Sequence, residues 1–268
     1  MRISYAWFLP LVLLMDLSGC ASMYQSQNQG DPVKMSQSET DLATDAWTRQ
    51  GNIRGALEHA LKAIELDPDN ADAHHLAAIL YLDFCRTSAI GECRLDEAEK
   101  HARLAVAGRK RFLEASNTLA VVLIHMERYD EAEKILIPIT QDILYNTPEI
   151  AWGNLGWTYL EQDQPEKAIP ALRRAIAAQP LFCVGNYRLG VAYRQSGALE
   201  SAAEALNRAL ETDAPGCAAM QDAFLVRAEV YLALGDESRS RADLDHCMHL
   251  SKANDVGRRC SALLNTLN

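Results

Sequence analysis

Residues 152–180 decide the fold and read WGNLGWTYLEQDQPEKAIPALRRAIAAQP. Gly156 and Ala168 stand among large apolar residues in this stretch, which ends on a proline. The same spacing returns 34 residues later, with Gly190 and Ala202 in the places of the two small residues. Small residues let two helices approach closely, large residues fill the layer between helix pairs, and proline ends a helix. The period therefore predicts consecutive helix hairpins, each stable only when stacked on its neighbours.

This spacing resembles the tetratricopeptide repeat, a helix hairpin with the pattern W-x2-L-G-x2-Y, then A-x3-F, then P. Weaker copies lie on both sides of the decisive stretch, and together they predict an all-α superhelix of about six hairpins. Residues 253–268 carry apolar residues at helical spacing and are expected to form a C-terminal cap helix. Extra residues relative to the repeat are expected around 83–94 and 214–220. The predicted repeats cover residues 37–70, 71–112, 113–146, 149–182, 183–216 and 221–252.

Residues 1–19 have the form of an export signal. Arg2 precedes an apolar run that is too short to span a bilayer, and an ordinary helix with a chance cysteine is the alternative interpretation of this run. The run ends in Leu17-Ser18-Gly19-Cys20, which resembles the lipobox of bacterial lipoproteins. The resemblance implies cleavage before Cys20, acylation of its thiol and, because no aspartate follows, an outer-membrane address. The polar residues 20–36 are expected to form a flexible tether.

Six cysteines remain after the lipobox, and an exported protein can hold them as disulfides. Sequence alone allows fifteen pairings. The repeat map narrows them, because two cysteines bracket the insertion in the second repeat, two begin and end the fifth, and two lie in the sixth repeat and the cap. Buried free cysteines are the alternative, and zinc is disfavoured because no C-x2-C pair occurs and His101 is alone. The predicted pairs are Cys85–Cys93, Cys183–Cys217 and Cys247–Cys260.

Charge and motifs exclude several classes of function. The net charge of −10 argues against nucleic-acid binding, which needs clustered lysine and arginine. The sequence has no G-x-S-x-G, P-loop, G-x-G-x-x-G or H-E-x-x-H motif. His74 and His75 are adjacent on a helix and point in different directions, which is poor for chelation, while His246 and His249 lack a third ligand and are interpreted as surface or cap residues. We therefore expect no catalytic residue, cofactor, metal or small-molecule substrate.

The inner face of the superhelix is the predicted working surface, because the first helix of each repeat lines it in this architecture. The residues at these positions are apolar with aromatic anchors, which suits an amphipathic helix or an extended hydrophobic peptide. The alternative is that some of them pack against neighbouring helices. A clamp for a C-terminal carboxylate is disfavoured, because its basic partner positions are occupied by other residue types. The predicted groove residues are Asn117, Val121, Ile124, Trp157, Leu160, Tyr187, Val191 and Arg194, with His75, Ile79 and Leu82 from the second repeat.

The lipobox and the repeat number together resemble the type IV pilus pilotin family of lipoproteins, PilF, PilW and Tgl. The sequence of the first repeats, GALEHALKAIELDPDNADAHHLAAILY, is similar to that of this family. The extra cysteines and the cap helix resemble the Tgl branch most. The resemblance implies a lipoprotein on the periplasmic face of the outer membrane. It implies that this lipoprotein binds the pilus secretin subunit and promotes its membrane insertion and multimerisation. A general periplasmic adaptor that scaffolds cell-envelope enzymes is the alternative.

Overall fold

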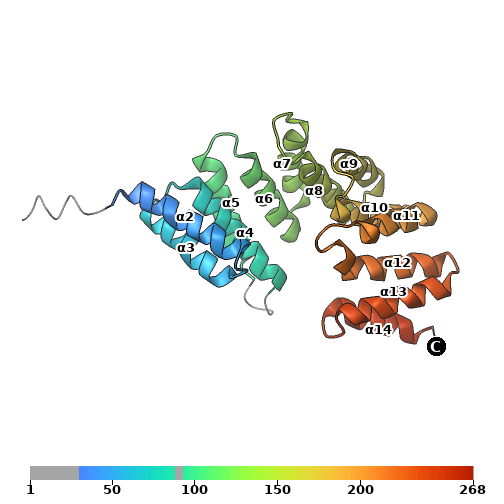
Figure 1. Ribbon diagram of the computed structural model, residues 1–268. Coiled ribbons are helices and arrows are strands. Elements are labelled where there is room, and N and C mark those ends of the chain that lie inside the picture. Colours follow the sequence, from blue (N-terminus) through green and yellow to red (C-terminus); the bar gives the residue numbers. More distant parts are fainter. Residues whose placement is uncertain (1–29, 88–92, 268) are drawn as a thin grey trace, which may run out of the picture.

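The computed structural model describes residues 30–87 and 93–267, which form thirteen α-helices and one short 3-10 helix (Figure 1). None of these helices is both long and apolar enough to cross a membrane. The predicted signal segment, Cys20 and most of the tether lie outside the described residues. The helices are α2 Pro32–Thr48, α3 Ile53–Leu66, α4 Ala71–Thr87, α5 Leu95–Gly108, α6 Leu113–His125, α7 Tyr129–Gln141, α8 Pro148–Glu161, α9 Pro165–Ala178, α10 Cys183–Gln195, α11 Leu199–Glu211, η1 Cys217–Ala219, α12 Gln221–Ala233, α13 Glu237–Leu250 and α14 Asp255–Asn265.

Consecutive helices pair into six hairpins, from α2/α3 to α12/α13, and α14 covers the last one. Gly156 of α8 lies so close to α9 that a Cβ there would be 2.5 Å from the Leu172 Cγ. Gly190 and Leu206 repeat this relationship in the next hairpin, at the same 2.5 Å. The small residues of the repeat are therefore required by close helix approach. The predicted all-α tetratricopeptide superhelix with a cap helix is confirmed.

The first helix begins earlier than the sequence predicts. Asp31 caps α2 by accepting a hydrogen bond from the Val33 amide at 3.1 Å, and Pro32 occupies the first turn. Ser36 is fully buried and donates to the Ala63 carbonyl of α3 at 2.7 Å. The predicted tether of 20–36 was therefore wrong at its end, because a polar residue that pairs with a neighbouring backbone is part of the hairpin core.

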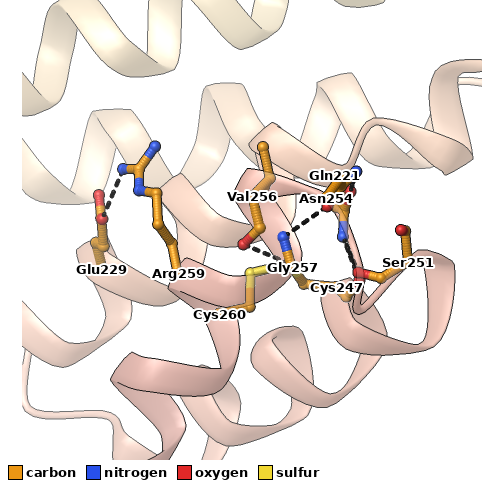
Figure 2. Close-up of a disulfide and its surroundings, with 9 residues drawn as sticks. All are labelled: Gln221, Glu229, Cys247, Ser251, Asn254, Val256, Gly257, Arg259 and Cys260. Carbon is orange, nitrogen blue, oxygen red and sulfur yellow. Dashed lines mark hydrogen bonds and ion pairs between the residues drawn. A yellow bond between two sulfur atoms is a disulfide. The ribbon is translucent and has the colours of Figure 1, made fainter. Parts of the chain in front are cut away.

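The cap helix is held to the last hairpin by covalent and polar links (Figure 2). Cys247 of α13 is joined to Cys260 of α14. The Gln221 side chain donates to the carbonyls of Cys247 and Ser251, at 2.7 and 2.6 Å, and accepts from the Asn254 amide at 2.7 Å. Asn254 also caps α14, accepting from the backbone of its third residue at 2.8 Å. One glutamine thus ties the start of α12 to the corner between α13 and α14.

Two other disulfides lie within the array. The structure joins Cys85 to Cys93, across the insertion of the second repeat, with Cα atoms 4.1 Å apart. It joins Cys183 of α10 to Cys217 of η1, with Cα atoms 5.8 Å apart. The pairing in the purified protein stays a prediction, which peptide mapping without reduction tests directly.

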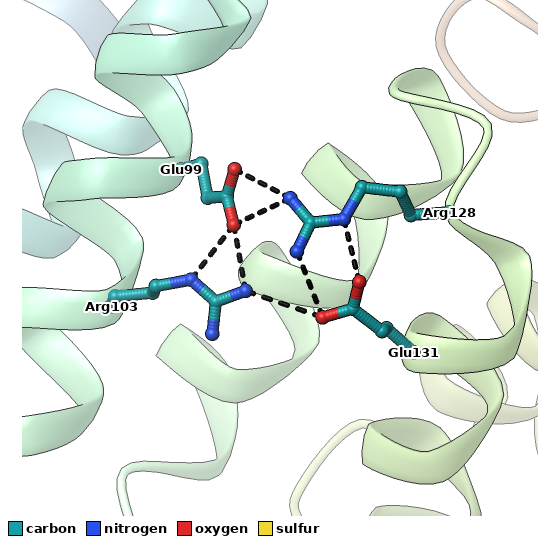
Figure 3. A network of polar contacts seen from close by, with 4 residues as sticks. All are labelled: Glu99, Arg103, Arg128 and Glu131. Atoms are coloured by element: carbon teal, nitrogen blue, oxygen red, sulfur yellow. Dashed lines mark hydrogen bonds and ion pairs between the residues drawn. The ribbon is translucent and has the colours of Figure 1, made fainter.

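An ion-pair network connects the second and third hairpins (Figure 3). The Arg128 guanidinium, at the start of α7, donates to both oxygens of Glu99 of α5 at 2.7 Å. It also makes two hydrogen bonds to Glu131, at 2.6 and 2.8 Å. Arg103 closes the ring at 2.6 Å from Glu99 and 3.5 Å from Glu131. Hydrogen bonding to Arg128 holds the pKa of Glu131 below its usual range. Because these charges are partly exposed, they orient the hairpins more than they stabilise them.

Candidate partner-binding pocket

A pocket of about 550 Å³ opens between α8, α10 and the start of α12. We call it the α10 pocket. Its large apolar lining residues are Trp157, Leu160, Val184, Tyr187, Val191 and Met220. Three charged side chains, Glu161, Arg188 and Asp222, also face the pocket.

One face of α10 forms the floor of this pocket. Val184, Arg188 and Val191 are spaced three or four residues apart, so they lie on one side of the helix. Trp157 and Leu160 have the same spacing on α8. The opposite face of α10 carries buried small residues that the hairpin with α11 requires. The face of α10 that carries Val184, Arg188 and Val191 is therefore available to contact a partner.

The pocket brings together four of the eleven predicted groove residues. The four are Trp157, Leu160, Tyr187 and Val191. They come from the first helices of the fourth and fifth hairpins, as the repeat architecture predicts. Their role in partner binding stays a prediction.

The other seven predicted groove residues, which include His75, Ile79 and Leu82 of the second repeat, do not line the pocket. Asn117 is only 8% exposed and accepts a hydrogen bond from Asn154 of α8 at 3.2 Å. Ile124 is 2% exposed and belongs to the largest apolar cluster, so its prediction as a groove residue was wrong. Both are covered because α6 is packed between its neighbours. Val121 is half-buried on the same helix, and Arg194 pairs with Glu229 of α12.

Arg188 is a charged residue whose hydrogen-bond acceptors are neutral. Its Nη1 donates to the Gly153 carbonyl at 3.0 Å and to the Asn154 side-chain oxygen at 3.1 Å. Its guanidinium carbon lies 4.6 Å from the centre of the Trp157 ring. Among the described residues, no carboxylate lies within ion-pair distance of it. Burial lowers the pKa of Arg188 to about 10, which still leaves it charged at neutral pH.

The aromatic residues of the pocket present both apolar rings and polar atoms. The Trp157 indole donates to Glu161 at 2.8 Å, which fixes the ring along the pocket wall. Burial raises the pKa of Tyr187 to about 12, so its hydroxyl is neutral and can donate a hydrogen bond. Tryptophan, tyrosine and arginine are the residue types that dominate the energetics of protein interfaces. The sequence analysis missed Arg188, although its spacing from Val184 and Val191 places it on the same face.

A buried histidine pair was also missed. His74 and His101 are 4% and 5% exposed, and their Nδ1 atoms lie 2.8 Å apart between α4 and α5. The other ring nitrogen of His74 lies 2.9 Å from the Pro68 carbonyl. The expectation that His101 stands alone was therefore wrong, because His74 is its direct neighbour. No group of three or more metal-ligating side chains occurs among the residues that the structure describes.

Comparisons with known proteins agree with this fold. Two models described as tetratricopeptide repeats match residues 111–180 and 153–216, and neither indicates an enzyme. The chain is 28% identical over 167 residues to the type IV pilus assembly protein PilF of Pseudomonas aeruginosa. This match covers 60% of the chain and 61% of that relative, so the chain spans about three-fifths of its length.

Two solved structures from pilus systems share the arrangement of helices. A structure of Pseudomonas aeruginosa PilF has a TM-score of 0.65 at 18% identity, covering 87% of this chain and 99% of that one. The structure of PilW, described as a widely conserved type IV pilus biogenesis factor, has a TM-score of 0.69 at 22% identity. It covers 84% of this chain and 97% of the PilW chain. At these identities the likeness shows the fold.

Proposed function

We propose that this tetratricopeptide-repeat protein, a relative of the type IV pilus biogenesis factors PilF and PilW, is a pilotin of the outer membrane. It is anchored through acylated Cys20 on the periplasmic side and binds the subunit of the pilus secretin. It promotes insertion and multimerisation of that subunit, and so supports pilus assembly and motility. The cysteines and the cap helix favour the Tgl branch of the family.

The α10 pocket is the observation that carries this proposal. Its volume lies in the range of pockets that bury a compact ligand or a few side chains. A hydrophobic segment of the secretin places apolar side chains between Trp157 and Val191. A carbonyl or carboxylate of the same segment accepts from Arg188, whose charge has no acidic partner among the residues that the structure describes.

The lipid anchor and the pocket act together in this mechanism. Anchoring confines the protein to a membrane surface and raises its effective concentration beside newly arrived secretin subunits. The pocket shields a hydrophobic segment from water until subunits meet one another. Release follows when contacts between subunits replace those in the pocket.

Pull-down of the secretin from membranes, with the anchor intact, tests the proposal. We expect Trp157→Ala to reduce secretin recovery about tenfold or more, because it removes an aromatic anchor. Trp152→Ala is the matched control, since Trp152 lies on the same helix and packs on the same apolar cluster as Trp157 but does not line the pocket. Both variants are first shown to unfold at similar temperatures. If they then recover equal amounts of secretin, the binding site lies outside the α10 pocket.

The anchor has its own test. Cys20→Ala is expected to leave a folded protein but to abolish heat-resistant secretin multimers at the outer membrane. Normal multimers in this variant would contradict a pilotin role. Specific recovery of a cell-wall enzyme, without secretin, would instead favour the general adaptor.

A further inference from the structure

The wall of the α10 pocket opposite α8 is an irregular segment. Residues 212–220 connect α11 to α12 and include the single turn η1. Ala219 and Met220 from this segment line the pocket, and Gln221 and Asp222 continue the wall at the start of α12. The pocket therefore depends on where a connection, and not a repeat helix, is held.

Hydrogen bonds do not fix this segment to α10. The bonds that the structure gives to residues 212–220 join them to one another or to the adjacent ends of α11 and α12. Examples are the Cys217 amide to Ala214 at 3.2 Å and the Met220 amide to Cys217, also at 3.2 Å. Gly216, with φ of 84°, turns the chain just before η1. The segment is internally folded but has no polar link of its own to the floor of the pocket.

The disulfide supplies this link. Cys217 is 1% exposed and is bonded to Cys183, the first residue of α10. Val184, which follows Cys183 directly, lines the floor, while Ala219 and Met220 lie two and three residues after Cys217. The bond therefore joins the floor to the wall at the edge of the pocket.

The far end of the wall is held separately. Gln221 is tied to the corner between α13 and α14 by the three hydrogen bonds shown in Figure 2. The wall is thus fixed at Cys217 to α10 and at Gln221 to the cap. Removal of the first attachment leaves the Gln221 hydrogen bonds and the apolar packing of Met220 in place. We therefore expect the repeats to stay stacked while residues 212–219 become more mobile.

We propose that the Cys183–Cys217 disulfide is a positioning element of the α10 pocket, which is binding-competent only when this bond is formed. The expected effect of this bond on binding rests on the function proposed above, in which the partner is the secretin. The proposal extends that function, because it assigns one of three disulfides to the site and the others to scaffold. Cys85–Cys93 closes a connection in the second repeat, and Cys247–Cys260 holds the cap.

The test compares two double variants of the full chain. Cys183→Ser with Cys217→Ser removes the bond without leaving a lone thiol, and Cys85→Ser with Cys93→Ser is the matched control. Amide hydrogen exchange is first measured without secretin. We expect exchange of residues 214–222 to rise about tenfold or more in the first variant and to stay unchanged in the control. Secretin affinity is expected to fall about tenfold in the first variant only.

Each result separates this inference from the function beneath it. Unchanged exchange of residues 214–222 overturns the positioning role. Raised exchange with unchanged secretin affinity supports the positioning role and shows that the secretin binds elsewhere. If the double variant does not fold, the same exchange is measured on wild-type protein that is folded first and then reduced, with alkylation of Cys183 and Cys217 confirmed by mass. Faster exchange of the wall upon that reduction supports the inference, and its absence overturns it.

Discussion

The Arg188 guanidinium stacks 4.6 Å from the centre of the Trp157 ring, and neutral oxygens of α8 accept its hydrogen bonds. A cation in this setting has lost much of its hydration without gaining a carboxylate in return. Such a charge costs stability in the free protein, and a partner that supplies an acceptor recovers the cost. The Arg188–Trp157 pair therefore predicts that the ligand of the pocket carries a hydrogen-bond acceptor for the guanidinium.

Replacement of Arg188 by methionine tests this link. We expect Arg188→Met to weaken secretin binding about tenfold, while the free energy of unfolding changes by less than about 1.5 kcal/mol, because methionine keeps most of the packing volume. Titration calorimetry and urea unfolding measure the two quantities. Arg188→Lys is the control that keeps the charge but not the planar fork, and should retain part of the affinity. Full affinity in the methionine variant would show that the charge does not serve binding.

Acid should destabilise the second hairpin through His101. Burial, together with the neighbouring His74, lowers the pKa of His101 to about 4, against about 6.5 for an ordinary histidine. Between these values the unfolded chain binds a proton that the folded protein resists, so stability falls as the pH drops from 6.5 to 4. The full loss is about 3 kcal/mol. The pKa of about 4 already includes the opposing effect of Glu97, which lies 3.8 Å from the His101 ring and favours its charged form.

Urea unfolding at several pH values measures this effect. His101→Leu is expected to remove the His101 contribution to the pH dependence between 6.5 and 4, while His75 and His125, whose pKa values are also lowered by burial, keep theirs. The substitution also costs stability at neutral pH, because His74 loses its partner. His249→Gln, at an exposed position, is expected to leave the dependence as it is in the wild type. The same pH dependence in both variants would assign it to other groups.

A buried ion pair should contribute strongly to the sixth hairpin. Arg227 of α12 donates twice to Asp243 of α13, at 2.8 and 2.7 Å, and the two side chains are only 14% and 8% exposed. Asp243→Ala leaves the guanidinium without its partner, and we expect a loss of about 3–5 kcal/mol in urea unfolding. Asp45→Ala, which breaks the exposed pair with Arg49, should cost less than about 1 kcal/mol. Similar losses in the two variants would contradict the role of burial.

The small residue of the repeat gives a packing test. Gly156→Ala places a methyl group 2.5 Å from the Leu172 Cγ, and we expect it to destabilise the protein by about 1–3 kcal/mol. Leu172→Ala alone leaves a cavity and should cost about 2–5 kcal/mol. The double variant should cost less than the sum, because the two changes compensate in volume. Additive losses would show that the two side chains are not in competition.

The repeat period was enough to predict the hairpins, their order and the cap helix. It could not predict that α2 begins at Pro32. The sequence shows Ser36 as a polar residue, and only the structure shows that it is buried by a hydrogen bond to the Ala63 carbonyl. The groove residues could be predicted only in part, for a related reason. The pattern says which positions face inward, but it does not say that Ile124 is covered by neighbouring helices. The wall of the α10 pocket comes from residues inserted between two repeats, and an insertion has no template to predict its course.

The early start of α2 also sets a distance. Eleven residues separate Cys20 from Pro32, which makes twelve Cα–Cα steps. A polypeptide of that length reaches at most about 40 Å when fully drawn out. If Cys20 is acylated as proposed, the first hairpin stays within that distance of the bilayer, and the length of the helical array decides how far from the membrane the α10 pocket meets its partner.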